Sequence, residues 1–289
     1  MTVKTLLSFG HGYSAQALTK RLLAAGWRII GTTRTAEKAA KLAETGIEPF
    51  IWPGENIGPA LRTANTLLLS AAPGAEGDPV LALLKDQIID AAPHLDWVGY
   101  LSTTGVYGDH AGGWVDETTP LTPSTQRGRA RVDAEAAWQA IPGLPLHIFR
   151  LAGIYGPGRG PFAKVRAGTA RRIIKKNQIF SRIHVDDIAQ VLAASLEQPR
   201  PGAIYNLCDD DPAPPQDVIG YAATLLGLPE PASEDFATAE MSPMARSFYA
   251  ESKKVRNALI KTELGVRLDH PDYRSGLQAL HRTETMLAK

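Results

Sequence analysis

The chain has 289 residues, of which 44% are hydrophobic and 21% charged, the proportions of an ordinary soluble globular protein. Its formal net charge of +1 gives no electrostatic reason to expect nucleic acid or an acidic membrane as a partner. The one cysteine, Cys208, excludes an intramolecular disulfide and a cysteine-rich zinc site. The sequence has no apolar run of 18 residues, and residues 1–10 are expected to form a strand rather than a cleavable signal, so a cytoplasmic protein is expected.

The N-terminal segment has the order strand, glycine turn, helix. An apolar run at residues 6–9 precedes a predicted helix over 17–23, and between them stands Gly10-His11-Gly12-Tyr13-Ser14-Ala15. A helix start beside a tight glycine turn offers free N–H groups and the positive end of the helix dipole to a pyrophosphate. Gly10 permits the turn, Gly12 lets phosphate approach, and Ala15 allows close helix–strand packing. The pattern predicts a dinucleotide site at residues 10–15; the alternative is a strand–helix turn with a structural role only.

The second predicted strand, residues 28–34, indicates which dinucleotide is bound. An NAD site usually has Asp or Glu at the end of this strand to bind the ribose 2′-hydroxyl, and this chain has Thr33 and Arg34. A carboxylate would repel a 2′-phosphate, whereas a guanidinium binds it through two hydrogen bonds. NADP is therefore predicted, with NAD as the alternative if Arg34 is only a solvated residue at a strand end.

Strand and helix patterns then alternate, which predicts an α/β fold with a Rossmann doubly wound parallel sheet. Further strands are expected at 49–52, 66–71, 97–102, 147–151 and 203–207, and helices at 36–44, 80–91, 128–141 and 185–197. Residues 157–160, rich in Pro and Gly, are expected to form a loop.

The last 80 residues lose this alternation. Helices are expected at 216–226, 252–264 and 273–286, with an irregular segment over 229–247. We expect a dinucleotide-binding domain of residues 1–155, to which 183–207 returns. Residues 156–182 and 208–289 are expected to form a small, mainly helical cap that binds substrate.

Six motifs occur in the order found in one family. They are Gly10-x-Gly12-x-x-Ala15, Ser102-Thr103-Thr104-Gly105-Val106-Tyr107-Gly108, Glu117-Thr118-Thr119-Pro120-Leu121-Thr122-Pro123, Arg150-Leu151 with Tyr155-Gly156-Pro157-Gly158, Ile183-His184-Val185-Asp186-Asp187, and Tyr205-Asn206-Leu207. The chain thereby resembles the extended and atypical branch of the short-chain dehydrogenase/reductases, the NAD-dependent epimerase/dehydratase family. The resemblance implies an oxidoreductase or epimerase that acts on a small polar, sugar-like molecule, as a monomer or a homodimer.

The chain departs from the family at the catalytic pair. The family's Tyr and Lys lie four residues apart, one helical turn, so both reach the cofactor. Counting from Pro123, these positions are Arg127 and Arg131. Arginine stays protonated and cannot act as a general base, although Arg131 could still bind ribose hydroxyls. Thr103 falls on the family's catalytic Ser/Thr position, where it either holds a substrate oxygen or lines the core.

The resemblance also implies contacts outside the fingerprint and the catalytic pair. The expected cofactor contacts are Ser70, Ala71, Ala72 and Ser102, and the expected substrate contacts are Tyr107, Trp114, Arg182 and His184. Some family members have an Arg at the position of Phe180, and Arg182 shares its face in an extended segment. No metal is expected, since His184, Asp186 and Asp187 match a helix start at which acids cap N–H groups.

Loss of the Tyr–Lys pair leaves a second hypothesis open. A protein that binds NADPH without turnover, and senses the NADPH/NADP ratio, would keep the phosphate turn and lose the dyad. A purely structural module would bind no dinucleotide.

Overall fold

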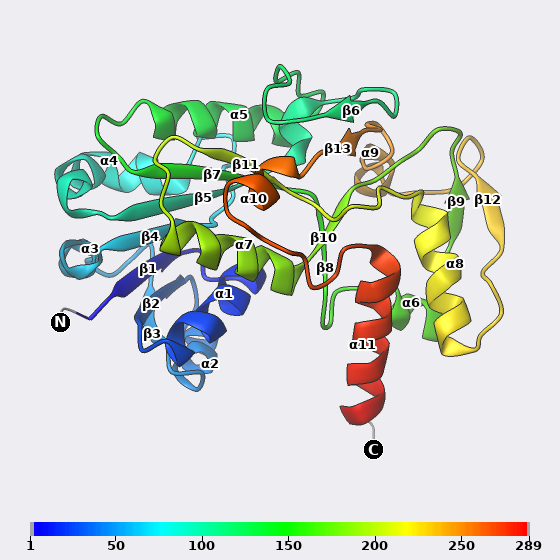
Figure 1. The fold of residues 1–289 in the computed structure, drawn as a ribbon, viewed down its shortest axis with the longest axis horizontal. Coiled ribbons are helices and arrows are strands. Elements are labelled where there is room, and N and C mark those ends of the chain that lie inside the picture. Colours follow the sequence, from blue (N-terminus) through cyan, green and yellow to red (C-terminus); the bar gives the residue numbers. More distant parts are fainter. Residues whose placement is uncertain (1–2, 288–289) are drawn as a thin grey trace.

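In the computed structural model, which describes residues 3–287, the chain builds a seven-stranded parallel sheet with helices on both faces (Figure 1). The strand order is β11-β7-β5-β4-β1-β2-β3. The strands are β1 (Thr5–Phe9), β2 (Arg28–Thr33), β3 (Glu48–Ile51), β4 (Thr66–Leu69), β5 (Trp97–Thr103), β7 (Leu146–Leu151) and β11 (Ile204–Leu207). The expected α/β, doubly wound fold is therefore confirmed.

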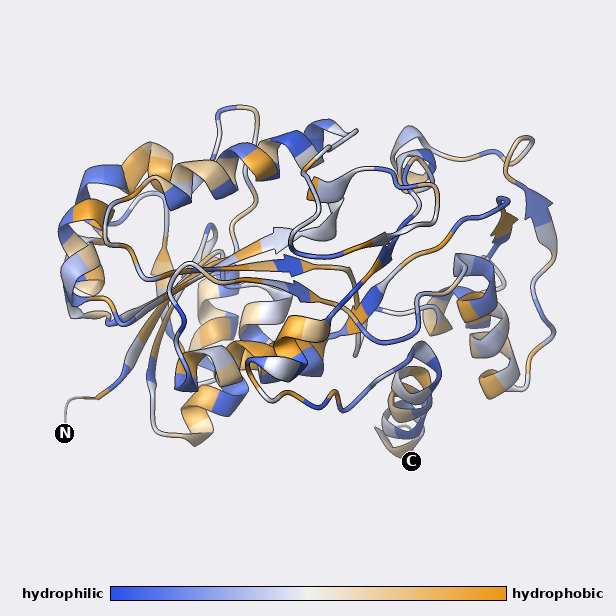
Figure 2. Ribbon diagram, turned by 45° about the horizontal axis from the view of Figure 1, so that its top comes forward, coloured by the Kyte–Doolittle hydropathy of each residue, from blue (hydrophilic) through white to orange (hydrophobic). Residues whose placement is uncertain are grey.

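Two layers of helices cover the sheet. One face carries α1 (Tyr13–Ala24), α2 (Ala36–Ala43), α7 (Val185–Glu197) and α10 (Ala258–Thr262), and the other carries α3 (Gly58–Thr63), α4 (Pro79–Ala91) and α5 (Gln126–Gln139). Leu18 and Ile188 are fully buried on the first face and Trp138 on the second. Burying each such side chain contributes about 1.5–3 kcal/mol. In Figure 2 the strands carry hydrophobic stretches that end in more hydrophilic residues, and the surrounding helices mix hydrophobic and hydrophilic residues.

The strand order reverses at β1, which pairs with β2 on one side and β4 on the other. Leu7 lies opposite Ile30 of β2 and Leu67 of β4. In open parallel sheets a ligand crevice forms at the carboxyl ends of the strands on either side of such a reversal. The turns that follow β1 and β4 therefore border the expected crevice.

Besides the apolar cores on the two faces of the sheet, a separate apolar cluster surrounds Phe162, Ala222 and Leu277. It joins α6 (Phe162–Arg166), α8 (Pro215–Leu226) and α11 (Tyr273–Leu287), which lie at one end of the molecule (Figure 1). Three two-stranded parallel sheets lie outside the large sheet: β8 (Gly153–Tyr155) with β10 (Arg182–His184), β9 (Arg172–Ile174) with β12 (Ser233–Asp235), and β6 (Trp114–Val115) with β13 (Lys254–Val255). Between residues 3 and 287, no helix has the length and apolar character needed to cross a bilayer.

The helix expected over 252–264 is wrong. The backbone of Ser252 bonds instead to the loop before β6: its amide donates to Asp109 Oδ1 (2.7 Å), and its carbonyl accepts from His110 and Gly112. The following residues pair as β13, and only α10 is helical. Residues 229–247, expected to be irregular, contain β12 and the short helix α9 (Pro243–Ser247), and the short helices η1 (Ala92–His94) and η2 (Thr104–Tyr107) flank β5.

Candidate functional site

The turn after β1 ties three strand ends together. Gly10 has φ +71°, and a Cβ on it would lie 2.8 Å from the Ala71 nitrogen, so only glycine fits. Its amide donates to Thr32 Oγ1 (2.8 Å), and its carbonyl accepts from Ser70 Oγ (2.5 Å). The residues expected at the cofactor turn and after β4 are thereby in contact.

The start of α1 is open to an external acceptor. Gly12 is its N-cap, with no capping side chain, and the first turn holds no acid. A Cβ on Gly12 would meet only the Gly10 carbonyl, at 3.6 Å, so space remains in front of the backbone. The first N–H groups of a helix have no partner within it. Tyr13, Ser14 and Ala15 therefore present amides and a positive dipole end to this space, an arrangement that fits a pyrophosphate.

The loop after β8 contacts the first residue of this helix. The Tyr13 hydroxyl donates to the Pro157 carbonyl (3.0 Å), and the Arg159 guanidinium lies 5.7 Å from the Tyr13 ring centre. Gly156 approaches so closely that a Cβ there would lie 2.5 Å from the Tyr13 hydroxyl oxygen. These contacts with Tyr13 hold the loop after β8 next to the first turn of α1.

His11 packs as a neutral ring against β2. It is 7% exposed, and burial lowers the pKa of its imidazole to about 4. Neither ring nitrogen has a hydrogen-bond partner within residues 3–287. A Cβ on Gly31 would lie 2.9 Å from His11 Cγ, so the strand needs glycine there to accommodate the ring. The His11 side chain therefore contributes packing at the turn, and its backbone follows Gly10.

The end of β2 carries a free cation. Thr33 is buried, and its carbonyl accepts from the Trp52 amide (2.8 Å). Arg34 follows it, is exposed, and has no hydrogen bond or ion pair with any residue that the structure describes. A guanidinium in this position is available to a phosphate.

The ends of β1 and β4 are level with each other, and β5 extends beyond them. Phe9 lies opposite Leu69, and Leu69 lies opposite Tyr100, so β5 continues three residues further, to Thr103. Thr103 is half-buried, and its Oγ1 accepts from the Gly105 amide (3.1 Å). The structure thus brings the predicted turn residues and Thr103 to one edge of the sheet.

Arg131 is held within the protein through one guanidinium nitrogen, Nη1. Its guanidinium donates to the Leu101 carbonyl (2.6 Å) and the Tyr100 hydroxyl (3.1 Å), and the side chain is 9% exposed. Arg127, one turn earlier on α5, is exposed and has no such partner among residues 3–287. The two arginines at the family's Tyr and Lys positions therefore have different surroundings.

A buried polar network lies beneath this edge. Glu135 and Arg150 form an ion pair (2.7 Å), and Ser102 Oγ donates to Glu135. Arg150 donates to the Tyr107 hydroxyl (3.0 Å), which donates to Asn206 Oδ1 (2.7 Å). Burial raises the pKa of the Tyr107 phenol, which Arg150 opposes. Tyr107, expected at the substrate, is fully buried, and its hydroxyl is satisfied within the protein.

Arg182 lies on β10, beside a buried acid. Its guanidinium donates to the Phe180 and Ala213 carbonyls (3.0 Å each) and lies 6.0 Å from the Tyr273 ring centre. Asp209 is 1% exposed, and neither of its carboxylate oxygens has a hydrogen-bond partner in the described part of the chain. Burial raises the pKa of Asp209 to about 8, with Arg182 opposing the rise. Asp209 is therefore largely protonated near neutral pH.

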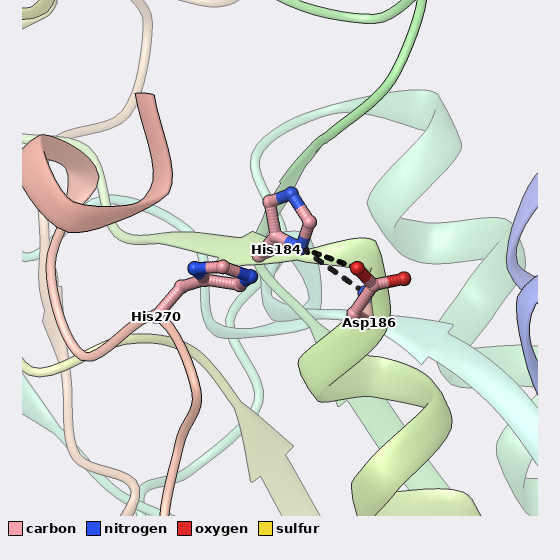
Figure 3. Close-up of side chains that lie close together, drawn as sticks. All are labelled: His184, Asp186 and His270. Atoms are coloured by element: carbon pink, nitrogen blue, oxygen red, sulfur yellow. Dashed lines mark hydrogen bonds and ion pairs between the residues drawn. The ribbon is translucent and has the colours of Figure 1, made fainter. Parts of the chain in front are cut away.

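His184 caps a helix. Its Nδ1 accepts from the Asp186 amide (3.2 Å), and its ring centre lies 4.0 Å from that of His270 (Figure 3). Burial, and then His270, lower the pKa of His184 to about 4. Two imidazoles and the Asp186 carboxylate have the chemistry of a divalent-metal site. However, the Nδ1 lone pair is already used, and the positive end of α7 disfavours a cation. We therefore assign no metal to this cluster.

Trp114, Arg182 and His184, expected at the substrate, lie on β6 and β10 rather than on the large sheet. Trp114 is 48% exposed, and Lys254 and Arg256 lie 5.5 and 4.8 Å from its ring centre. The burial of Asp209 and the pairing of Arg150 with Glu135 do not follow from a local sequence pattern. The ion pair forms only when α5 packs on β7.

Comparison with known proteins agrees with this geometry. Residues 81–208 match the model of the NAD dependent epimerase/dehydratase family. A functionally unknown conserved protein from Silicibacter pomeroyi DSS is 62% identical, with a TM-score of 0.95 over 97% of this chain and 99% of that one. Protein YeeZ of Escherichia coli (strain K12) is 28% identical over 93% of this chain and 97% of its own length. UDP-glucuronic acid 4-epimerase from Bacillus cereus, in complex with NAD, is 17% identical, with a TM-score of 0.76 over 99% and 100% of the two chains.

Proposed function

Since the chain belongs to the NAD-dependent epimerase/dehydratase family, we propose that it is an NADP-dependent oxidoreductase or epimerase that acts on a small polar molecule. The observation that carries this proposal is the uncapped start of α1 at Gly12, open in front of its amides and bordered by the turn after β4. A dinucleotide's pyrophosphate satisfies those amides without displacing any protein group.

The cofactor would be held by residues at three strand ends. The backbone from Gly10 to Ala15 would bind the pyrophosphate, Thr33 and Arg34 would hold the 2′-phosphate, and Ser70, Ala71 and Ala72 would border the crevice. The NAD of the Bacillus cereus epimerase supports a nicotinamide cofactor, and the unpaired Arg34 favours the phosphorylated form. When bound, the nicotinamide supplies or accepts hydride.

On the substrate side, Thr103 would hold a substrate oxygen at the edge of β5. Arg131 would keep this edge in place, because it joins α5 to the Leu101 carbonyl. We propose that residues 156–182 and the described part of residues 208–289 form the cap over the substrate, with Trp114 and Arg182 facing it; residues 288 and 289 lie outside the described chain. Tyr107, Ser102 and His184 would then act through packing and hydrogen bonds within the protein.

The test is NADPH consumption in the presence of a panel of small carbonyl compounds, followed by absorbance for the wild type and Thr103→Val. The proposal expects turnover with at least one compound and a loss of at least about tenfold in the variant. Tight NADPH binding without turnover of any compound would favour the sensor. That alternative is supported by the two arginines at the positions of the family's catalytic pair.

A further inference from the structure

Arg127 and Thr103 both lie where α5 packs on the carboxyl end of β5. Arg131 bonds to the Leu101 carbonyl, which gives one fixed contact between α5 and β5. Two residues further along β5, about 6.6 Å, is Thr103, and one helical turn back along α5, about 5.4 Å, is Arg127. Because α5 begins at the carboxyl end of β5, both steps lead toward the same edge.

A second contact fixes the first turn of α5 against this edge. A Cβ on Gly128 would lie 2.8 Å from the Gly105 carbonyl oxygen, so the helix and the turn after β5 are in close contact. Gly105 also donates its amide to Thr103 Oγ1 (3.1 Å). Arg127, the residue before Gly128, therefore lies in the helical turn that packs on this edge.

The charge of Arg127 is not compensated by the protein. The first turn of α5 holds no acid, and Arg127 has no ion pair with a described residue. Glu251 reaches the start of α5 through Ser124 Oγ (2.6 Å), but its other oxygen binds Lys253 (2.6 Å). An unpaired guanidinium thus belongs to the turn of α5 that packs on Gly105, two residues from Thr103, at the position where the family has a neutral phenol.

We infer that the substrate carries an anionic oxygen group, a carboxylate or a phosphate, next to its reacting carbon, and that Arg127 binds this group. The inference rests on the proposed function, in which Thr103 holds the substrate's hydroxyl or carbonyl oxygen. A guanidinium binds two oxygens of a carboxylate or phosphate through parallel N–H bonds, a geometry that a neutral sugar does not offer. The substrate class is then hydroxy or oxo acids, or their phosphorylated counterparts.

The experiment measures anion binding to the protein already saturated with NADPH. Oxalate, inorganic phosphate and the neutral oxamide are titrated by calorimetry at constant ionic strength, with wild type, Arg127→Met and Arg129→Met. Arg129 is a matched control, since it lies two positions further along the same exposed turn and donates to the Ser124 carbonyl (2.9 Å). Thermal melting shows whether the variants fold as the wild type does.

The expected result is that oxalate or phosphate binds the wild type, oxamide does not, and Arg127→Met weakens the anion about 10- to 100-fold. Arg129→Met should stay within about twofold of the wild type. Preference for oxalate identifies a carboxylate substrate, and preference for phosphate a phosphorylated one. If NADPH binds but neither anion does, or if Arg127→Met binds them as the wild type does, the inference is overturned while the proposed function stands. If NADPH itself does not bind, both fall.

Discussion

The carboxylate of Glu135 and the guanidinium of Arg150 form an ion pair of 2.7 Å in the interior, with side chains only 3% and 4% exposed. The pair joins α5 to β7 and is continued by Ser102 on one side and Tyr107 on the other. Because Ser102 immediately precedes Thr103, the pair fixes the strand end that carries the proposed substrate contact.

Removing either partner of this pair should be strongly destabilising. Glu135→Leu or Arg150→Met alone leaves one buried charge unpaired, and each should lower the free energy of unfolding by about 3–5 kcal/mol. The double variant leaves neither charge, so its loss should be smaller than the sum of the two single losses by at least about 1 kcal/mol. Urea unfolding of the four proteins measures this coupling; additive losses would show that the two side chains act independently.

The two turn glycines should respond differently to one added methyl group. Gly12 has φ −107° and space in front of it, so Gly12→Ala should change stability by less than about 1 kcal/mol yet weaken NADPH binding at least about tenfold. Gly10→Ala should destabilise the protein by about 1–3 kcal/mol, because its φ is +71° and its Cβ would press on Ala71. Thermal melting and fluorescence titration separate the effects. Unchanged binding in Gly12→Ala would contradict the assigned pyrophosphate site.

Arg34 should decide between the two nicotinamide cofactors. Arg34→Asp replaces a free guanidinium with a repelling carboxylate, so NADPH binding should weaken by about 1.5–3 kcal/mol. NADH has no 2′-phosphate and serves as the internal control, with an expected change below about 0.5 kcal/mol. Equal losses of binding free energy for NADPH and NADH, measured by fluorescence titration, would show that Arg34 does not bind the 2′-phosphate.

Because of Asp209, the free energy of unfolding should decrease as the pH rises. Its pKa is raised from 3.8 to about 8 by burial, so the folded state binds more protons than the unfolded state between these values. The stabilisation it contributes is therefore full below about pH 4 and is lost as pH rises toward 8. Asp209→Asn cannot ionise, so it should gain about 1–3 kcal/mol on the wild type between pH 5 and pH 8.

The control for this prediction is Asp211→Asn, two residues further on. Asp211 forms an exposed ion pair with Arg274 (2.7 Å), so its loss should cost less than about 1 kcal/mol and leave the wild-type pH trend in place. Denaturant unfolding at several pH values provides the comparison. If Asp209→Asn followed the wild type at every pH, the carboxyl group would have to be ionised and solvated in the folded protein.

The elements of the large sheet could be predicted from the sequence because their patterns are local. A buried strand such as β1 is a continuous apolar run, and the turn at Gly10 follows from residues adjacent in sequence. The failed helix over 252–264 shows the limit of this reasoning. Residues 252–264 have apolar residues at helical spacing, such as Val255 and Leu259, but the backbone from Ser252 to Val255 pairs with β6 and the loop before it, so tertiary contacts override propensity.

Only the part of the candidate site that is formed by residues close together in the sequence could be predicted. The amides of α1 and the free Arg34 belong to one strand–helix–strand unit, so the prediction of their roles rests on order and spacing alone. The surroundings of Arg131 do not: its hydrogen bonds to Tyr100 and Leu101 span about thirty residues of sequence. Arg131 has hydrogen bonds within the protein and Arg127 has none with a described residue, and this difference arises only from the packing of α5 on β5.

Calorimetric titration of the intact protein with NADPH and with NADH tests most directly whether the amides at the start of α1 hold a dinucleotide. We predict saturable binding of both at one site per chain, with NADPH the tighter by at least about tenfold. The absence of heat and of any thermal stabilisation with either cofactor would contradict the site, the enzymatic proposal and the sensor alternative alike.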